Sequence, residues 1–380
     1  MDVPPPDLSG LLLGPEPDFS GQPPEVVAIL TRTAEVTKSL LSELADQVDA
    51  ADMSPLPQME ALAETGLLGL HLPPEMGGAG GGEEAGILAR LITAAGCGVT
   101  TFILLQHLFA TKTMQHLMEE AGQPLLPECA ELTRMEWLTG VCLAHLGRRG
   151  EPRVRAEIEG DEIRFKGEAP WMTGWGLIRR VLVGGRNRQG QGVIALADLE
   201  GQEDRIQVVS PYRLQVMEAT RTVAPVFRDF RVPRSRLVAV INDAKQIDPG
   251  MRIHLDASGC SLGVGGAANL RLHRRGEQRA DETLKRASAM LAGSLADMWR
   301  RLWALATDPK ATLDERQLCR AECNLLSNRV TYALIASEGG SADLVGNTAN
   351  RLFREAFAYT FNAHTPSFRD ALLMGLVRDL

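Results

Sequence analysis

The sequence has no excess of positive charge and no long apolar run. Its 380 residues include 40 Lys and Arg against 48 Asp and Glu, so the formal net charge is −8. Nucleic acids and anionic membranes attract basic surfaces, and the sequence therefore indicates neither as a partner. The apolar run at residues 102–110 is far too short to cross a bilayer. We expect a soluble protein without a membrane span.

Cysteine pairs and targeting signals are also missing. The six cysteines form no CxxC pair and no Cys/His group with zinc spacing, so the sequence predicts no metal site. Cys319 and Cys323 lie one helical turn apart, a spacing typical of packed or idle thiols. The first two dozen residues hold seven prolines, which is unlike a signal or transit peptide. A reducing cytoplasm is the expected location.

A proline-rich start precedes a helical region. Residues 1–23 are rich in Pro, Gly and acids, and we expect a disordered lead there. Apolar residues then recur at intervals of three, four and seven, which predicts an all-α domain over residues 24–134. Within it, the stretch GLLGLHLPPEMGGAGGG at residues 66–82 is most simply a mobile loop.

Residues 135–247 change to short alternating or β-rich runs separated by turn signals. No helical pattern lies between these runs, so we expect an antiparallel sheet in a small barrel or sandwich. The predicted strand segments are 137–146, 153–158, 162–167, 179–184, 192–198, 206–209 and 222–232. Residues 248–380 return to helical periodicity, most clearly over 279–306, 312–337 and 343–361. The predicted order is therefore α, then β, then α.

Two short motifs match known enzymes by spacing alone. Residues 259–263, GCSLG, fit the GxSxG nucleophile elbow, and Asp343 and His364 follow in the order of a hydrolase triad. Residues 263–268, GVGGAA, fit the GxGxxA dinucleotide fingerprint. Both motifs require parallel strands alternating with helices, and this context is missing here. The plainer interpretation is a helix whose small residues allow close packing.

The histidines do not form a recognisable metal or catalytic motif. The sequence contains no HExxH, EF-hand or Walker pattern. His107 and His116 lie in helical stretches, where we expect ordinary polar positions or hydrogen-bonded core histidines.

The stretch EAPWMTGWG at residues 168–176 is the most informative part of the chain. On a strand, Trp171 and Thr173 would point to one face and Met172 to the other. An aromatic face beside a hydroxyl suits a planar heterocycle with polar edges. The alternative is a hairpin end with a half-buried tryptophan.

Several segments, taken in order, resemble the acyl-CoA dehydrogenase family of FAD-dependent flavoproteins. The run GLLGLHLPPEMGGAG is similar to that family's helix-then-loop signature, WMTGWG to its W-I-T segment, and VFRDFRVP at 226–233 to its F-x-D-V-x-V-P strand. Near the end, the segments LADM at 295–298, Gly339-Gly340 and RLFREA at 351–356 follow in the family's order. The resemblance covers roughly residues 25–370. It implies an α+β multidomain fold with an N-terminal α-helical domain, a middle antiparallel β-barrel at 135–247 and a C-terminal four-helix bundle at 248–380.

The resemblance also implies a cofactor, which would be FAD or FMN, and a set of residues that bind it. Trp171 would lie against the flavin ring and Thr173 would hydrogen-bond the reactive edge of the flavin, with Met172 between them in the same cofactor-binding segment. Gly339 and Gly340 would approach the FAD phosphates, usually across a subunit interface, and Thr365 would lie at the last FAD-contacting turn. The family's T-E-P-x-x-G-S-D loop is replaced here by AHLGRRGEP at 144–152, which places Ala144 and His145 at the flavin.

The chain departs from the family where the reaction takes place. The alignment of REA at 354–356 with the family's R-D-A places Ala363 where the catalytic glutamate stands. A methyl group cannot remove a proton, and thioester desaturation needs a base. His254 and Asp256 are candidates for a displaced base, although solvated or packed roles suit them as well. The arginine that meets the FAD pyrophosphate has no clear counterpart, because Arg279 lacks the following Phe-Gly.

The ending HTPSFRD at 364–370 is similar to that of flavin monooxygenases with this fold, which need no carboxylate base. Three functions follow from the resemblance. The first is an FAD-dependent oxidoreductase acting on an acyl-CoA thioester with a displaced base. The second is a monooxygenase or hydroxylase that uses reduced flavin and oxygen. The third is a homologue without catalysis that acts as a binding subunit. A homodimer or homotetramer is implied, with an electron acceptor or a flavin reductase as a partner.

Overall fold

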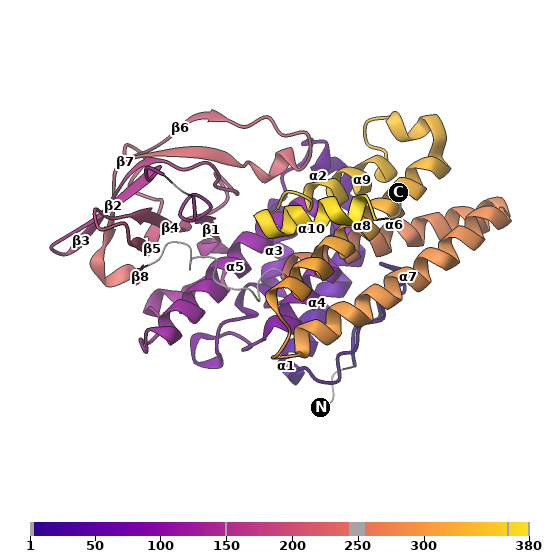
Figure 1. The fold of residues 1–380 in the computed structure, drawn as a ribbon, viewed down its shortest axis with the longest axis horizontal. Helices are drawn as coiled ribbons and strands as arrows, with labels where there is room; N and C mark the ends of the chain where they lie inside the picture. Colours follow the sequence, from indigo (N-terminus) through magenta and orange to yellow (C-terminus); the bar gives the residue numbers. More distant parts are fainter. Residues whose placement is uncertain (1–3, 149, 243–254, 363–364, 379–380) are drawn as a thin grey trace.

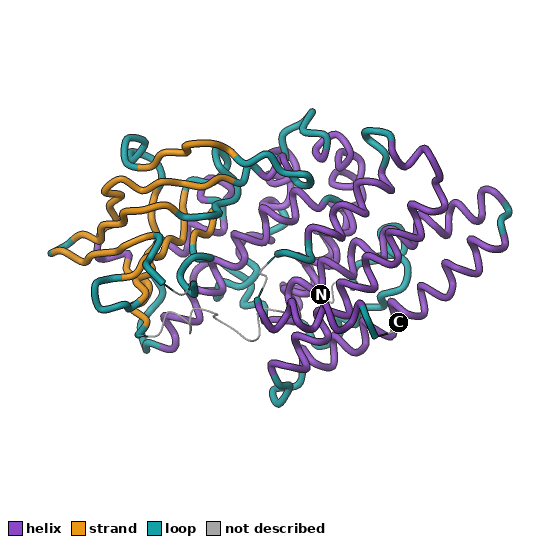
Figure 2. The backbone as a smooth tube through the Cα atoms, turned by 45° about the horizontal axis from the view of Figure 1, so that its top comes forward, coloured by secondary structure: helices purple, strands orange, loops and turns teal. Residues whose placement is uncertain are grey.

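The computed structural model describes residues 4–148, 150–242, 255–362 and 365–378. Figure 1 shows the strands gathered at one end of an elongated molecule and the long helices at the other, and Figure 2 shows the same division from a second direction. The predicted order of helices, strands and helices is confirmed. In the part of the chain described here, no helix is both long and apolar enough to span a bilayer.

The N-terminal region is helical, as its periodicity predicts. Of its longest helices, α4 is buried all round from Ala85 to Gly96 and α5 is buried over most of its length, and the break between them falls at Cys97. The helices are α1 (Pro24–Val36), η1 (Thr37–Leu41), α2 (Ser42–Asp49), α3 (Leu56–Glu64), α4 (Glu83–Gly96) and α5 (Gly98–Glu120).

The central region forms one eight-stranded sheet. Its strands are β1 (Thr139–Cys142), β2 (Val154–Glu159), β3 (Glu162–Glu168), β4 (Arg180–Arg186), β5 (Gly192–Asp198), β6 (Ile206–Pro211), β7 (Val223–Pro233) and β8 (Leu237–Ile241). The strand order is β6-β7-β3-β2-β4-β5-β8, and β1 also pairs with β4. Most pairings are antiparallel, as expected, but β1 and β2 each pair with β4 in parallel. Alternation along a strand predicts which side chains are buried and does not identify the neighbouring strand, so sequence alone does not reveal these two pairings.

The C-terminal helices begin at residues that suit helix starts. Asp281 caps α7, Thr312 and Glu315 form a capping box on α8, and Asn347 caps α9. The helices are α6 (Asp256–Arg279), α7 (Glu282–Thr307), α8 (Leu313–Glu338), α9 (Thr348–Ala358) and α10 (Pro366–Leu376). Cys319 and Cys323 are both buried on α8, in line with the interpretation as packed thiols.

Both glycine motifs lie on α6, in the interior of the molecule. A Cβ atom on Gly259 would stand 2.5 Å from the Ile87 carbonyl oxygen of α4, and one on Gly263 would stand 2.3 Å from that of Leu91. These distances are too short for any side chain. The motifs are therefore a small-residue packing surface, as the plainer interpretation predicts, and neither a hydrolase elbow nor a dinucleotide loop.

The N-terminal lead differs from the expectation of disorder over residues 1–23. Within its described part, residues 4–23, the side chains of Leu8, Leu11 and Leu12 are buried. The backbone N–H of Leu13 donates to the Gly266 carbonyl at 3.0 Å. The high Pro and Gly content of the segment predicts disorder. Burial of the leucine side chains is nevertheless enough to hold the segment on α6.

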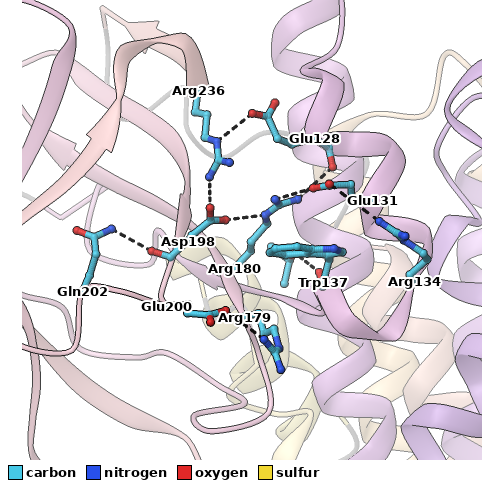
Figure 3. A network of polar contacts seen from close by, with 11 residues as sticks. Glu128, Glu131, Arg134, Trp137, Arg179, Arg180, Asp198, Glu200, Gln202 and Arg236 are labelled. Carbon is cyan, nitrogen blue, oxygen red and sulfur yellow. Dashed lines mark hydrogen bonds and ion pairs between the residues drawn. The ribbon is translucent and has the colours of Figure 1, made fainter.

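The sheet is attached to the N-terminal helices through one buried arginine (Figure 3). Arg180 of β4 donates from Nε to Asp198 at 2.7 Å and pairs through Nη2 with Glu131 at 2.6 Å. Its guanidinium also lies 3.9 Å from the centroid of the Trp137 ring. The arginine thus links β4 and β5 to the turns at Pro127–Thr133 and Met135–Trp137.

His107 of α5 makes a second connection between helices and sheet. Its Nε2 donates to the Leu68 carbonyl at 3.1 Å, and its Nδ1 accepts the backbone N–H of Thr139 at 3.2 Å. This is the hydrogen-bonded core histidine that the sequence predicts. Burial lowers its pKa from 6.5 to about 4, because the charged imidazole would lose water and one of these two bonds.

Arg180→Met is expected to lower the free energy of unfolding by about 1 to 3 kcal/mol, because it removes a buried guanidinium that pairs with two partly exposed carboxylates and donates to the Glu128 carbonyl. The measurement is the shift of the denaturant unfolding transition. Arg179→Met is the matched control, since Arg179 pairs with Glu200 on the exposed surface, where a pair contributes about 1 kcal/mol or less. Equal losses in the two variants would contradict this assignment.

His107→Gln is expected to flatten the dependence of stability on pH. The unfolded chain binds a proton near pH 6.5, and folded His107 resists it until about pH 4. Its contribution is therefore present above pH 6.5 and is lost as the pH falls, by about 2 kcal/mol between pH 7 and pH 5. Unfolding curves at these two pH values measure the effect. His116→Gln, on the same helix with a side chain 47% exposed, is the control.

Candidate functional site

The segment 169–176 is held against the start of β7 by its backbone. The N–H of Met172 donates to the Val223 carbonyl at 2.9 Å, and the reverse bond has the same length. The Gly174 N–H donates to the Thr220 carbonyl at 2.9 Å. Met172 is completely buried, and Gly174 has a φ of +89°, which a side chain would disfavour. The backbone therefore fixes the positions of Trp171 and Thr173.

Trp171 presents its ring to solvent. Its side chain is 45% exposed, which is unusual for so large an apolar group in a rigid segment. The Tyr212 ring lies against it, with centroids 4.5 Å apart and planes inclined by 41°. The Tyr212 hydroxyl donates to the Pro170 carbonyl at 2.7 Å, which fixes the tyrosine. One aromatic face is thus supported and accessible.

Thr173 ends a chain of three buried hydroxyl groups. Its Oγ1 lies 2.9 Å from Oγ1 of Thr222, which lies 2.9 Å from Oγ1 of Thr220. Each hydroxyl can donate or accept, and the central Thr222 hydroxyl can donate to one neighbour or accept from both. Thr173 can therefore act as a donor or as an acceptor toward a ligand. We call Trp171, Tyr212 and this hydroxyl chain the Trp171 face.

The turn that carries Thr220 has an uncommon backbone. The short helix η6 (Glu218–Thr220) lies between Met217 and Arg221, whose φ values are +60° and +50°. Side chains other than glycine rarely adopt this region, and such residues cluster at functional sites. Helix α5 packs against η6, so the Trp171 face lies on the side of the sheet that meets the helices.

The loop that replaces the family's flavin loop is fixed from inside the sheet. Arg186 of β4 donates from Nε to the Leu146 carbonyl at 3.1 Å. His145 is buried, with Nε2 2.8 Å from the Gly184 carbonyl, and its Nδ1 has no hydrogen-bond partner. Burial lowers the pKa of His145 to about 4. Ala144 is exposed beside it.

The other predicted cofactor residues lie at the helical end of the molecule. Gly339 ends α8 with a φ of +65°, and a Cβ at Gly339 or Gly340 would meet only open space. Thr365 caps α10, where its Oγ1 accepts the Phe368 N–H at 3.2 Å. His254, Ala363 and His364 lie outside the described residues. The structure thus brings together Trp171, Met172 and Thr173, and it places Gly339, Gly340 and Thr365 elsewhere.

A second polar site lies where α4, α5 and α6 meet. Asp256, the first residue of α6, lies 3.4 Å from Arg90 Nη1 and accepts a hydrogen bond from Lys112 Nζ at 3.2 Å. His71 completes this group, which we call the Arg90 cluster, and its Nδ1 lies 2.8 Å from the Gly81 carbonyl oxygen. A Cβ on Gly86 would stand 2.6 Å from Arg90 Nη1 and 3.0 Å from the His71 ring, so a larger residue would displace these side chains.

Charges shape the ionisation of the Arg90 cluster. Burial opposes the ionised form of Asp256, but Arg90 and Lys112 outweigh it and lower the pKa of that carboxyl group. Burial, Lys112 and Arg90 lower the pKa of His71 to about 3, so its imidazole is neutral. The nearby Glu83, which pairs with Arg316 at 3.1 Å, has its pKa raised to about 7 by burial and by Asp256.

Sequence reasoning missed most of these residues. Tyr212 and Thr222 stand 41 and 51 positions after Trp171 and belong to no motif. His71, Arg90 and Lys112 are ordinary residues in helical or glycine-rich stretches. Asp256 is the one member of the Arg90 cluster that the sequence singles out, as a candidate for the displaced base. Among the described residues, no three His, Cys, Asp or Glu side chains are arranged to hold a metal ion.

The residues of the Trp171 face fit the ring end of a flavin. They supply a supported aromatic face and a buried hydroxyl that can take either hydrogen-bonding role. The nucleotide end is less complete, because Arg279 is exposed and lacks the family's Phe-Gly.

Comparisons with known proteins agree with this architecture. Residues 23–133 match the family described as "Acyl-CoA dehydrogenase, N-terminal domain". The probable acyl-CoA dehydrogenase YngJ of Bacillus subtilis (strain 168) is 26% identical over 210 residues, which cover 54% of this chain and 55% of YngJ. The match thus spans about half the length of that relative.

Solved structures match over nearly the whole chain. Butyryl-CoA dehydrogenase from Megasphaera elsdenii has a TM-score of 0.75 at 14% identity and covers 96% of this chain and 100% of its own. Dibenzothiophene monooxygenase (TdsC) from Paenibacillus sp. A11-2 has a TM-score of 0.72 at 16% identity, with coverages of 93% and 97%. At these identities the likeness establishes the fold.

Proposed function

We propose that the chain is a divergent member of the acyl-CoA dehydrogenase family and an oxidoreductase that binds a flavin, FAD in the first place, at the Trp171 face. The observation that carries this proposal is the half-exposed Trp171 ring beside the Thr173 hydroxyl chain. A bound flavin would supply hydride transfer, while the protein supplies binding, orientation and polarity.

The protein's own residues have distinct tasks in this proposal. Trp171 offers its ring for stacking, and Tyr212 prevents it from rotating. Thr173 offers one hydrogen bond to the polar edge of the ring system, and Thr222 orients that hydroxyl. Buried Met172 anchors the segment between them. A rigid surface of this kind lowers the entropy lost when a planar ligand binds.

Asp256 is a poor candidate for the missing base. Arg90 and Lys112 stabilise its ionised form, and a carboxylate held in this way has little tendency to accept a proton. The first reaction class that we propose, thioester dehydrogenation, therefore needs a base other than Asp256, and His254, which lies outside the described residues, is the other candidate from the sequence. The match of the N-terminal domain to the acyl-CoA dehydrogenase family supports this class.

The second candidate function is a monooxygenase or hydroxylase that uses reduced flavin and oxygen. Ala363 at the position of the glutamate and the paired state of Asp256 both favour a reaction without a carboxylate base. The structural likeness to a monooxygenase shows that the fold is compatible with such chemistry. For either function we propose a homo-oligomer, which is supported by exposed apolar side chains on and after α9 and α10, including Phe357, Phe361 and Leu373.

Trp171→Leu is expected to weaken FAD binding about fivefold, because aromatic stacking contributes about 1 kcal/mol beyond buried area. Thr173→Val, which keeps the shape and removes the hydroxyl, is expected to weaken binding about threefold to tenfold. The measurement is titration of the purified protein with FAD, followed by quenching of flavin fluorescence. Trp303→Leu in α7, far from the sheet, is the control. If neither FAD nor FMN binds the wild-type protein, the flavin proposal fails and the non-catalytic homologue is favoured.

The two reaction classes differ in what the flavin-loaded protein does under anaerobic conditions. A thioester dehydrogenase is expected to lose its flavin absorbance when acyl-CoA thioesters of increasing chain length are added without oxygen. A monooxygenase is expected to leave that absorbance unchanged and to react rapidly with oxygen once its flavin is chemically reduced. Stopped-flow absorbance distinguishes the two outcomes, and bleaching by a thioester would rule out the second.

A further inference from the structure

The Arg90 cluster contains more positive than negative charge. Among the described residues, Arg90 and Lys112 pair with one carboxylate, that of Asp256, and His71 is neutral. Glu83 lies near Lys112 as well, but burial and Asp256 raise its pKa to about 7. The neighbouring Arg316 is already matched by Glu83. Arg90, His71 and Asp256 are each at least nine-tenths buried. An unbalanced buried charge costs several kcal/mol unless an ion of opposite sign accompanies it.

Several atoms of this cluster also lack hydrogen-bond partners within the described part of the chain. On Arg90, Nε and Nη1 have none, although Nη1 lies within ion-pair distance of Asp256. The Nε2 atom of His71 and the Oδ1 atom of Asp256 have none either. Buried polar atoms are almost always paired in folded proteins. Four such atoms in one cluster indicate a site for a polar ligand.

Whether each of these atoms is a hydrogen-bond donor or an acceptor determines which groups a ligand must carry. The guanidinium donors of Arg90 and the spare positive charge require an anionic acceptor. His71 donates from Nδ1 to the Gly81 carbonyl in its neutral form, so its Nε2 can only accept. The free oxygen of Asp256 is an acceptor as well. A ligand that satisfies both sets needs an anionic group and, beside it, a hydrogen-bond donor.

We propose that Arg90 and Lys112 bind the carboxylate of a small 2-hydroxycarboxylate, or of a larger molecule that carries this group, while its hydroxyl donates to His71 or Asp256. Arg90 suits a carboxylate because its guanidinium is always charged and its hydrogen bonds to carboxylates are strong. Lys112, whose side chain is 20% exposed, places the cluster within reach of solvent. Gly86 leaves the space in which Arg90 and His71 meet.

This site is independent of the flavin proposal. Its residues belong to α4, α5, α6 and the loop before α4, and none of them forms part of the Trp171 face. It can therefore be tested on the purified protein with no flavin added, and a failure of either proposal leaves the other in place.

The test is calorimetric titration of the wild-type protein with lactate, acetate and methyl lactate. Lactate is expected to bind saturably, and acetate, which lacks the hydroxyl, at least threefold more weakly. Methyl lactate lacks the charge and is expected not to bind measurably. Equal affinities for lactate and acetate, or no saturable binding of lactate, would overturn the proposal.

Variants assign the binding to these side chains. Lys112→Met is expected to weaken lactate binding about tenfold or more, the effect of losing one charge-assisted hydrogen bond. Asp256→Asn removes the negative charge that competes with the ligand carboxylate for Arg90 and Lys112, and this variant is expected to bind lactate more tightly. Lys310→Met, which removes an exposed lysine between α7 and α8, is the charge-matched control. Circular dichroism verifies that each variant is folded, and an unchanged affinity in folded Lys112→Met would overturn the assignment.

Discussion

The close contact between α4 and α6 is the constraint on which the centre of the molecule depends. Gly259 and Gly263 allow the α6 backbone to approach the carbonyl oxygens of Ile87 and Leu91 more closely than any side chain would permit. Arg90 lies between those two residues on α4, and Asp256 lies one turn before Gly259 on α6. The distance between the two charged side chains is thus set by the glycines, because only closely packed helices bring groups from both into one cluster.

The same contact joins the two helical regions into one body, and α5 carries the sheet on that body. His107 of α5 bonds to the backbone on both sides of the boundary, and Arg180 adds a buried ionic and aromatic connection at the neighbouring turns. Both connections depend on buried polar groups with fully specified geometry, which are costly to rearrange. The position of the Trp171 face relative to the helices is therefore set by a few polar contacts and by apolar packing around them.

The sequence predicts where the helices and strands of this fold lie better than it predicts which of them pack or pair with one another. Alternation locates seven of the eight strands, and helical periodicity locates the long helices, because both patterns report burial along a single segment. Pairing between β1 and β4, or between Thr173 and Thr222, depends on residues distant in the chain, and no local pattern encodes it. The GxSxG and GxGxxA matches show the opposite case, in which a local pattern is present and the function that it suggests is not. Their spacing is that of enzymes, but close helix packing also requires small residues four positions apart.

The two polar sites differ in how their side chains are satisfied, and this difference bears on function. The three threonine hydroxyls bond to one another, so the Trp171 face is stable as it stands and can change the direction of its bonds at little cost. The Arg90 cluster is different, because its charges are unbalanced and four of its atoms have no hydrogen-bond partner among the described residues. Apolar side chains of similar volume would stabilise such an interior as well or better. The net stability of a folded protein is only about 5 to 15 kcal/mol, so a cluster that lowers it is tolerated most readily where a bound ligand supplies the missing hydrogen-bond and charge partners. On this reasoning the hydroxyl chain is a preorganised surface whose hydrogen bonds are satisfied without a ligand. The charged cluster gains its full set of hydrogen-bond and charge partners only when its ligand is bound.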